Sequence, residues 1–495
     1  MAIHWHAWSL DSFEQARSAR KPVLLSIAAT WCASCAEMDR SSYADPRVVS
    51  IVSEQFVPVR VDADRRPDIA ERYNLGGLPT TAFLTGAGAV VGGGTFVDAD
   101  RLAAALEQVV SAFASRADEL HAADGRAPRE HPPSAARIAG PEDLARQVYD
   151  AFDPGFGGFG REPKFPLVAP LELLLQKYRE SREGTLRSML VHSLDAMGWG
   201  GLYDDVDGGF FRCASGRDWK SPHHEKLLDV NGALLGVYAT ASHDLQEHRY
   251  AERAQDVLRY VQTWLADQAE GGWFGSQASS PSYYSARTPE ARRALTPPAV
   301  DGVLYASANA TAVSAALRAA QLFDDQSLAA FALRSLERVV LATYVPGEGV
   351  AHAFDGAAGV RGLLDDQIAM AIAHLDAYDA TADIPYQMMA EELAHYAIRT
   401  MWDEEQGGFF DRAPAPEGEL IGRMAERLKP FVGNCEAARL LRRLAAASGD
   451  LSFASRADAT LESVAARAGA EGPLAAHYLL ALGQAGSGDT LPLLP

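Results

Sequence analysis

The stretch Trp31-Cys32-Ala33-Ser34-Cys35 decides the fold of the first part of this chain. It follows an apolar run at 23–28, whose length and β-branched residues predict a buried strand. Residues 36–40 predict the opening of a helix, which puts the two cysteines on a strand-to-helix turn. A helix N-terminus stabilises negative charge, and the thiolate is the nucleophile in disulfide exchange. The stretch therefore predicts a redox pair, in which Cys32 attacks a disulfide and Cys35 resolves the mixed disulfide.

A Cys-x-x-Cys pair is also half of a structural zinc site. Such a site needs four ligands, and no second Cys-x-x-Cys or His-x-x-x-His pair follows at the spacing of a zinc finger. Asp365 and Asp366 are adjacent carboxylates on a predicted helix, but the sequence offers no partner ligands for them. We therefore favour redox chemistry and predict no metal. We expect no cofactor beyond a redox-active Cys32–Cys35 disulfide.

The composition excludes several kinds of partner. The chain has 495 residues and a formal net charge of −20, so no basic stripe is available to bind nucleic acid or an anionic membrane. No apolar run approaches the roughly 18 residues that span a bilayer. The first residues lack the basic and apolar regions of a secretory signal, and four cysteines make no disulfide framework. We expect a cytoplasmic protein.

The elements that follow the cysteines complete a β-α-β-α-β-β-α order. Strands are expected at 57–62, after Pro79 and at 90–91, and helices at 41–56, 68–73 and 100–113. This order, with Trp31-Cys32-x-x-Cys35 and Gly77-Leu78-Pro79-Thr80, resembles thioredoxin over about residues 1–115. The resemblance implies a cis Pro79 and a substrate groove formed by Trp31, Leu78 and Pro79. The alternative is an ordinary turn proline that opens an edge strand.

A linker and a repetitive helical region follow. Residues 118–140 are rich in Ala, Pro, Arg, Gly and Ser, which is linker composition. After residue 140 a motif recurs between helical stretches, with successive copies 51 to 76 residues apart. The copies are Gly157-Gly158-Phe159, Gly208-Gly209-Phe210, Gly271-Gly272-Trp273 and Gly407-Gly408-Phe409, with a weaker one at Gly347-Glu348-Gly349. Repetition at this period fits one helical hairpin per repeat, and we predict an α/α toroid of about six hairpins.

Both halves together resemble the spermatogenesis-associated thioredoxin-fold proteins, in which a thioredoxin-like domain is fused to a six-hairpin, glycosidase-like toroid. The motifs that carry the resemblance include Pro163-Lys164-Phe165-Pro166, Gly201-Leu202-Tyr203-Asp204 and Trp219-x-x-Pro222-His223-x-Glu225-Lys226-Leu227. Relatives commonly carry Asp-Ala-Asp after Gln277, where this chain has Ala278-Ser279-Ser280.

The resemblance covers nearly the full length and implies a multidomain chain. The expected domains are an N-terminal α/β thioredoxin fold at 1–117, a linker at 118–140 and a C-terminal all-α (α/α)6 toroid at 141–495.

Eight polar residues are candidates for a toroid cavity: Lys164, Asp204, His223, Glu225, Lys226, Asn231, Arg423 and Asn434. Asp204 with Glu225 would supply the two carboxylates of a glycosidase, and His223 the base of a sugar epimerase. The alternative is structural, with these side chains bonding the loops between helices and Lys226 forming an ion pair. The sequence leaves both interpretations open.

The favoured function is a thioredoxin-like thiol-disulfide oxidoreductase fused to a helical toroid that binds a partner or a sugar-type ligand. The expected partners are a protein disulfide substrate or a reductase, with a carbohydrate as a further ligand. In one alternative the toroid is the main catalytic unit, a sugar hydrolase or epimerase, and the redox domain is regulatory. In another the chain is a non-catalytic binding scaffold.

Overall fold

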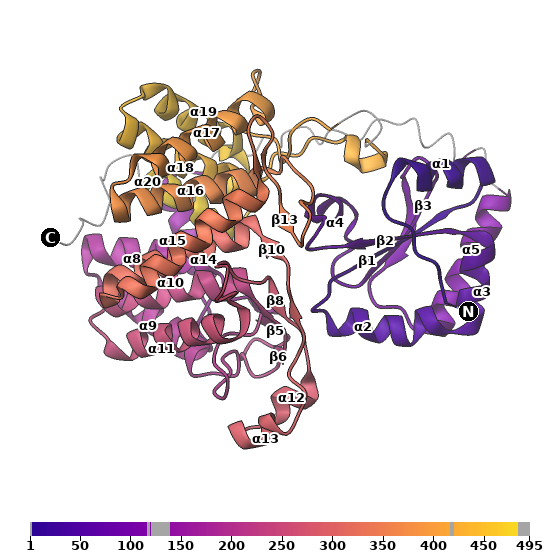
Figure 1. Cartoon of the computed structure of the whole chain (residues 1–495), viewed down its shortest axis with the longest axis horizontal. Helices are drawn as coiled ribbons and strands as arrows, with labels where there is room; N and C mark the ends of the chain where they lie inside the picture. Colours follow the sequence, from indigo (N-terminus) through magenta and orange to yellow (C-terminus); the bar gives the residue numbers. More distant parts are fainter. Residues whose placement is uncertain (1, 116–118, 120–138, 416–419, 484–495) are drawn as a thin grey trace. The chain divides into compact units, whose positions relative to one another are not determined.

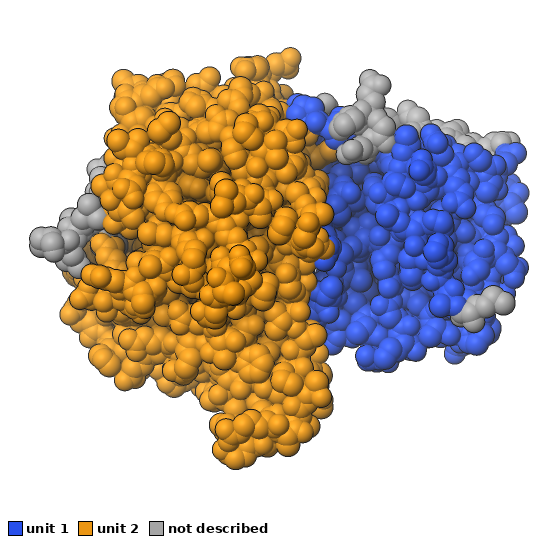
Figure 2. Space-filling model, viewed as in Figure 1, with its two compact units in different colours: residues 1–132, 414–427 blue, residues 133–413, 428–495 orange. Residues whose placement is uncertain are grey.

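The computed structural model describes residues 2–115, 119, 139–415 and 420–483. Backbone contacts divide the chain into two compact units, which Figure 2 shows in different colours. The first unit comprises residues 1–132 and 414–427, and the second comprises 133–413 and 428–495. Residues 414–427, which the sequence assigns to the toroid, thus belong to the first unit. The predicted linker at 118–140 lies outside the described residues except at positions 119, 139 and 140.

The first unit is built on a mixed four-stranded sheet with the order β2-β1-β3-β4 (Figure 1). Its strands are β1 (Val23–Ala28), β2 (Val57–Asp62), β3 (Thr80–Leu84) and β4 (Val90–Gly94). Strand β1 is parallel to β2 and antiparallel to β3, and β3 is antiparallel to β4. The helices are α1 (Leu10–Ala19), α2 (Ala33–Arg40), α3 (Pro46–Gln55), α4 (Pro67–Tyr73) and α5 (Ala99–Ser115). The predicted thioredoxin-like fold is confirmed.

Alternation along β1 produces two apolar cores, because successive side chains of a strand point to opposite faces. Val23, Leu25 and Ile27 pack with residues of α1 and α4 on one face. Leu24 packs with residues of α2, α3 and α5 on the other face. The cysteine turn at the end of β1 therefore stands on a strand that is buried on both sides.

The helix predicted at 41–56 is shorter than expected. Helix α2 ends at Arg40, a 3-10 turn covers Ser42–Ala44, and α3 begins only at Pro46. The Asp45 side chain accepts a hydrogen bond from the N–H of Arg47 at 2.8 Å, which caps α3. Proline suits the first turn of a helix because its missing N–H would have no partner there.

The second unit is a closed ring of helix pairs. Within the described residues six inner helices each contact the next, and the last contacts the first. They are α8 (Val168–Ser181), α10 (Leu228–Asp244), α14 (Ala306–Phe323), α16 (Leu364–Thr381), α18 (Phe431–Ser448) and α20 (Ala475–Gly483). The outer helices are α7 (Pro141–Asp150), α9 (Gly184–Gly198), α11 (His248–Tyr260), α15 (Gln326–Thr343), α17 (Ile384–Met401) and α19 (Leu451–Ala468). The predicted (α/α)6 toroid is confirmed.

Helices α7 and α20 complete the ring, since the first helix of this unit packs against the last. The glycine-glycine-aromatic turns all lie where an outer helix gives way to the next inner helix. Short two-residue strands cluster in the same connections: β5 (Cys213–Ala214), β6 (Pro222–His223), β7 (Lys226–Leu227), β8 (Ser276–Gln277), β9 (Val300–Asp301), β10 (Leu304–Tyr305), β11 (Tyr344–Val345), β12 (Gly349–Val350) and β13 (Ala353–Phe354). Two further short helices, α12 (Pro281–Ser285) and α13 (Pro289–Arg293), precede β9.

Candidate functional sites

The cysteine pair occupies the N-terminal end of α2, as the sequence predicts. Cys32 and Cys35 form a disulfide with their Cα atoms 5.2 Å apart. Cys32 is the residue that caps α2, and its Sγ accepts a hydrogen bond from the backbone N–H of Cys35 at 3.1 Å. This N–H and the helix dipole both favour negative charge at the Cys32 sulfur. The arrangement suits a nucleophilic thiolate at Cys32 once the disulfide is reduced.

Trp31 and Pro79 lie next to the cysteines. The indole Nε1–H of Trp31 donates a hydrogen bond to Asp64 Oδ2 at 2.6 Å, which fixes the ring. The Leu78–Pro79 peptide bond is cis, so this prediction is confirmed. Thr80 pairs with Ile27 at the end of β1, and the antiparallel register therefore brings Pro79 beside the strand end that leads to the cysteine turn. A substrate groove formed by Trp31, Leu78 and Pro79 stays a prediction. A second cis bond, Glu162–Pro163 in the toroid unit, was not predicted.

Asn231 and Asn434 bond the glycine-rich turns of the toroid. In each case the amide Oδ1 accepts from the backbone N–H of an aromatic residue, Phe210 at 2.7 Å and Phe409 at 2.6 Å. The Nδ2 donates to the carbonyl of the same aromatic residue, at 3.0 and 2.9 Å respectively. Both asparagines are fully buried, and these bonds satisfy backbone groups that would otherwise lack partners.

Lys226 and Asp204 form a buried ion pair at the turn Gly208-Gly209-Phe210. The Lys226 ammonium donates to Asp204 Oδ2 at 2.7 Å and to the carbonyl of Gly208 at 2.6 Å. The guanidinium of Arg292 donates to both Asp204 oxygens at 2.6 and 2.7 Å. Burial lowers the pKa of Lys226 to about 8, although Asp204 opposes this effect. The carboxylate of Asp204 is thus held by two cations.

Lys164 has the same arrangement at the preceding glycine-rich turn, Gly157-Gly158-Phe159. Its ammonium is fully buried and donates to Asp153 Oδ2 at 2.7 Å and to the carbonyl of Arg217 at 3.0 Å. Arg217 also donates to both oxygens of Asp153 at 2.7 Å. Burial by itself raises the pKa of Asp153, but Arg217 and Lys164 outweigh it and hold that pKa well below its usual range.

Glu225 and His223 are neighbours in the connection that carries β6 and β7. Glu225 is 3% exposed, and its Oε1 accepts from Arg212 Nε at 2.7 Å. His223 Nε2 hydrogen-bonds Ser215 Oγ at 2.9 Å, while its Nδ1 lies 3.8 Å from Glu225 Oε1. The distance of 3.8 Å is too long for a hydrogen bond. Asp204 and Glu225 thus each form an ion pair with an arginine, and Asp204 also pairs with Lys226.

The placement of Arg423 in a toroid cavity needs correction, because this residue belongs to the first unit. Its backbone N–H donates to the hydroxyl of Tyr73 at 2.9 Å, and its Nη1 donates to the carbonyl of Arg72 at 2.8 Å. The side chain thus bonds the C-terminal end of α4. No local pattern in the sequence links residues this far apart along the chain.

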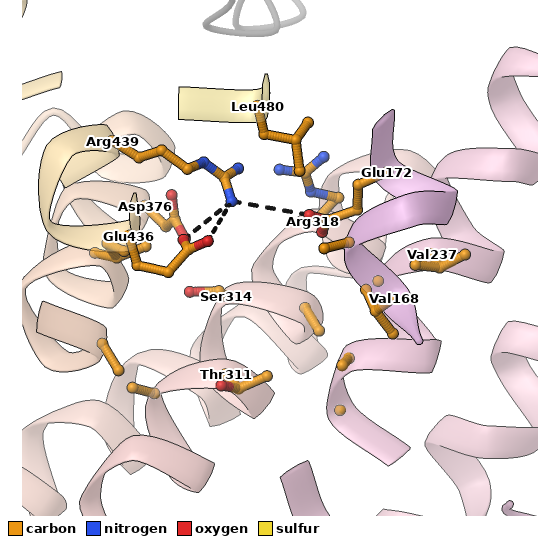
Figure 3. A pocket seen from close by; sticks show the side chains of 18 of the residues that line it. Val168, Glu172, Val237, Thr311, Ser314, Arg318, Asp376, Glu436, Arg439 and Leu480 are labelled. Atoms are coloured by element: carbon orange, nitrogen blue, oxygen red, sulfur yellow. Dashed lines mark hydrogen bonds and ion pairs between the residues drawn. The ribbon is translucent and has the colours of Figure 1, made fainter. Parts of the chain in front are cut away.

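The second unit holds a cavity of about 610 Å³ between its inner helices (Figure 3). None of the eight candidates predicted for a toroid cavity lines it. Its charged lining comes instead from several turns of the inner helices: Glu172, Arg179, Arg318, Asp365, Asp376, Asp379, Glu436, Arg439 and Arg443. Glu436, Arg439 and Arg443 follow the i, i+3, i+7 spacing of one helix face, and charged residues on an inward face were the signal available in the sequence.

Ion pairs hold most of these charges in place. The Arg439 guanidinium lies 3.0 Å from Glu436 Oε2, and His477 Nδ1 lies 2.7 Å from Glu436 Oε1. Burial by itself raises the pKa of Glu436, but Arg439 and His477 outweigh it and lower this pKa to about 2. Arg443 pairs with Asp376 at 2.7 Å and with Asp379 at 2.9 Å.

The described residues contain neither a candidate metal site nor a candidate membrane-spanning helix. In the described ranges, no group of three or more His, Cys, Asp or Glu side chains is arranged to hold a metal ion. No helix in the part of the chain that the structure describes has the length and apolar character needed to cross a membrane.

Comparisons with known proteins agree with this two-part architecture. Residues 1–128 match the family model Thioredox_DsbH, described as a protein of unknown function, DUF255. Spermatogenesis-associated protein 20 of Homo sapiens is 29% identical over 315 residues, or 56% of this chain and 39% of that protein. The predicted resemblance to this family is confirmed, and the aligned part spans about two fifths of these curated relatives. Thiol:disulfide interchange protein DsbD of Escherichia coli is 32% identical over 85 residues, 16% of this chain and 15% of that protein.

The toroid resembles solved structures of sugar-converting enzymes. Cellobiose 2-epimerase from Bacillus thermoamylovorans superimposes with a TM-score of 0.52 at 10% identity, covering 64% of this chain and 83% of that one. A D-mannose isomerase gives a TM-score of 0.52 at 13% identity, covering 66% of this chain and 85% of that one. At such low identity the likeness shows the fold alone.

Proposed function

We propose that this protein catalyses thiol-disulfide exchange through Cys32 and Cys35. The observation that carries the proposal is the position of Cys32 at the N-terminal end of α2, with its Sγ hydrogen-bonded to the N–H of Cys35 at 3.1 Å. Backbone N–H groups and the dipole at this position stabilise a thiolate. The thioredoxin-like sheet beneath the turn and the cis Pro79 beside it add support.

The exchange proceeds in two steps that balance in atoms and electrons. The Cys32 thiolate attacks one sulfur of a client disulfide, the client S–S bond breaks, and the second client sulfur leaves as a thiolate. The Cys35 thiolate then attacks the Sγ of Cys32, which forms the Cys32–Cys35 disulfide and releases the first client sulfur. The client has gained two electrons and the pair has lost two. A thiol reductase returns the pair to its dithiol form, which fits a cytoplasmic setting.

Trp31, Leu78 and Pro79 form the groove in which the client strand lies. Trp31 is fixed by its bond to Asp64, so the groove keeps one shape on that side. The expected clients are protein disulfides. The residues between the cysteines, Ala33 and Ser34, set the redox poise and hence the direction in which the exchange runs.

A trap for the mixed disulfide tests the proposal. In a full-length Cys35→Ser variant the second step is blocked, so the client stays bonded to Cys32 and mass spectrometry identifies it. The matched control is the Cys32→Ser, Cys35→Ser double variant, which keeps the two buried cysteines Cys213 and Cys435. We expect a discrete set of adducts in the single variant that the double variant lacks. Identical adduct patterns in both variants, or an empty trap with Cys32 reactive toward a small alkylating reagent, would rule the proposal out.

The sugar hydrolase alternative is not favoured at Asp204 and Glu225, the two carboxylates named for it. A glycosidase needs a carboxyl group free to donate a proton and a second one facing the sugar. Asp204 is held by Lys226 and Arg292, and Glu225 is held by Arg212. We therefore propose that these residues stabilise the turns between helices and that the toroid is a binding unit.

A further inference from the structure

The cavity inside the toroid is large enough for a small molecule. Its volume of about 610 Å³ falls within the range of roughly 300 to 1,000 Å³ that is usual for ligand sites. It is lined by residues of all six inner helices, so the ring of helices shapes it and no loop is needed to form it. A cavity with such walls is largely pre-formed.

The chemistry of the wall changes along the cavity. Near the first turns of the inner helices most of the lining is small or aliphatic, as at Val168, Gly232 and Val432, and Asp365 is the charged exception. Toward the later turns it becomes charged, and Figure 3 shows Arg439 and Glu436 of α18 facing Glu172 of α8. The Arg439 guanidinium lies 3.8 Å from Glu172 Oε2. Among the residues that line the cavity there is no Phe, Tyr or Trp, and the single ring is the imidazole of His477.

Most of the charged groups at the polar end compensate one another. Arg439 pairs with Glu436, and Arg443 pairs with Asp376 and Asp379. Arg179 on α8 also lines the cavity, and it pairs with Asp244 at 3.3 Å. These pairs leave hydrogen-bonding capacity unused, because a carboxylate accepts at about four positions and a guanidinium donates five hydrogens. The Glu172 and Asp379 side chains remain 43% and 41% exposed.

Arg318 differs from the other three arginines. It is an exposed residue in the C-terminal half of α14, and it makes no hydrogen bond or ion pair with any residue that the structure describes. Ser314 lies one turn earlier on the same helix. Burial by itself raises the pKa of Asp376, whereas Arg443, Ser314 and the charge of Arg318 lower it. A guanidinium in this position offers a planar fork that matches a carboxylate or a phosphate.

We propose that the toroid cavity binds a small polyhydroxylated molecule that carries one anionic group. Arg318 binds the anion, and the hydroxyl groups bond the carboxylates of Glu172, Asp376 and Asp379 and the donors of Arg439. Each ligand hydroxyl both donates and accepts, which a wall of alternating carboxylates and guanidinium groups requires. A purely apolar ligand would strip water from these charges without replacing its hydrogen bonds. A ligand that relies on stacking finds no Phe, Tyr or Trp in the lining, and the imidazole of His477 is paired with Glu436.

Binding of matched six-membered-ring probes to the full-length protein tests this proposal. D-glucuronate has hydroxyls and a carboxylate, D-glucose lacks the carboxylate, and cyclohexanecarboxylate lacks the hydroxyls. Isothermal titration should show binding of D-glucuronate or D-galacturonate at least about tenfold tighter than of D-glucose or cyclohexanecarboxylate. Arg318→Gln should weaken the binding of the anionic probe about tenfold or more and leave that of D-glucose unchanged, while Arg318→Lys retains part of the affinity.

The control is Arg334→Gln on the outer helix α15 of the same hairpin, an exposed arginine outside the cavity lining. It should bind like the parent. Equal affinity for D-glucose would refute the role of Arg318, and equal affinity for cyclohexanecarboxylate would refute the role of the hydroxyls. Failure of both sugar acids, D-glucuronate and D-galacturonate, to bind at millimolar concentration would overturn the proposal as a whole. None of these results depends on Cys32, so the redox proposal and this one stand or fall separately.

Discussion

Single buried amide side chains hydrogen-bond four of the glycine-rich turns of the toroid. Asn309 on α14 accepts from the N–H of Trp273 at 2.8 Å and donates to the same residue's carbonyl at 2.9 Å. Gln367 on α16 bonds Val350 in the same way, at 2.9 and 3.0 Å. Asn231 and Asn434 make the same pair of hydrogen bonds, so this interaction is repeated around the ring. A buried amide is used because it can satisfy a backbone donor and an acceptor at once.

His374 on α16 should make the stability of the toroid fall in mild acid. It is 4% exposed, and its Nδ1 lies 2.7 Å from the carbonyl of Met370. Burial lowers its pKa from 6.5 to about 4, against a weaker opposing effect of that carbonyl. Between those two pH values the unfolded chain binds a proton that the folded chain does not, so the free energy of unfolding falls as pH falls.

The measurement is chemical denaturation of the parent and of His374→Gln at pH about 7 and about 4.5, where the unfolded imidazole is respectively mostly neutral and mostly charged. We expect the parent to lose about 2 kcal/mol more than the variant between these conditions. Titration of carboxyl groups also lowers the free energy of unfolding over this range. It does so in both proteins, and the comparison cancels that effect. Parallel losses in the two proteins would contradict the buried neutral state of His374.

At the scale of one element, the glycine-rich turns require glycine for two separable reasons. Gly209 and Gly160 both have positive φ, 78° and 77°, which L side chains rarely adopt. A Cβ at Gly209 would lie 2.4 Å from the ring of Tyr260, whereas at Gly160 nothing lies within 4 Å. The first position combines backbone strain with a clash, and the second has backbone strain alone.

Alanine at these two glycines should therefore destabilise the protein to different extents. Gly160→Ala should cost about 1 kcal/mol, because only the left-handed backbone disfavours it. Gly209→Ala should cost about 1 to 3 kcal/mol more, because the Tyr260 ring must move. Denaturant midpoints of the two variants measure the difference, with Gly160→Ala as the matched control. Equal shifts would mean that the ring moves freely and that the turn is less tightly packed than the structure indicates.

Elements were easier to predict than the cavity for a physical reason. Strands at 23–28 and 57–62 were predicted with their observed bounds, because a short apolar run between turn residues is a local signal. The glycine-rich turns were predicted from their repetition. Glu172, Asp376 and Glu436 were missed because they meet only after the ring closes, from helices far apart in the sequence. The polar residues of the motifs do not line the cavity but hydrogen-bond the turns between helices. The sequence cannot separate these two roles, because structural and catalytic groups use the same residue types.

At the scale of the whole molecule, the first unit is completed by a segment that is remote in sequence. Ile421 and Met424 join the core that holds Phe13, Ile27 and Tyr73, and both are almost fully buried. The Arg72 guanidinium donates to the carbonyl of Glu426 at 2.8 Å. The thioredoxin-like fold therefore includes residues that follow most of the toroid in the sequence.

Ile421→Ala should destabilise the first unit selectively. Ile421 is 5% exposed, whereas its neighbour Leu420 is 37% exposed and serves as the control. Removing the buried side chain leaves a cavity against Tyr73 and should cost about 3 kcal/mol, while Leu420→Ala should cost less than about 1 kcal/mol. Hydrogen exchange should show faster exchange of the β1 and β3 amides in Ile421→Ala and unchanged exchange in α14, since unfolding equilibria differ between parts of a structure. If β1 and β3 stay fully protected, the segment that carries Ile421 does not stabilise the thioredoxin-like fold. If α14 exchanges faster as well, the two units unfold together rather than independently.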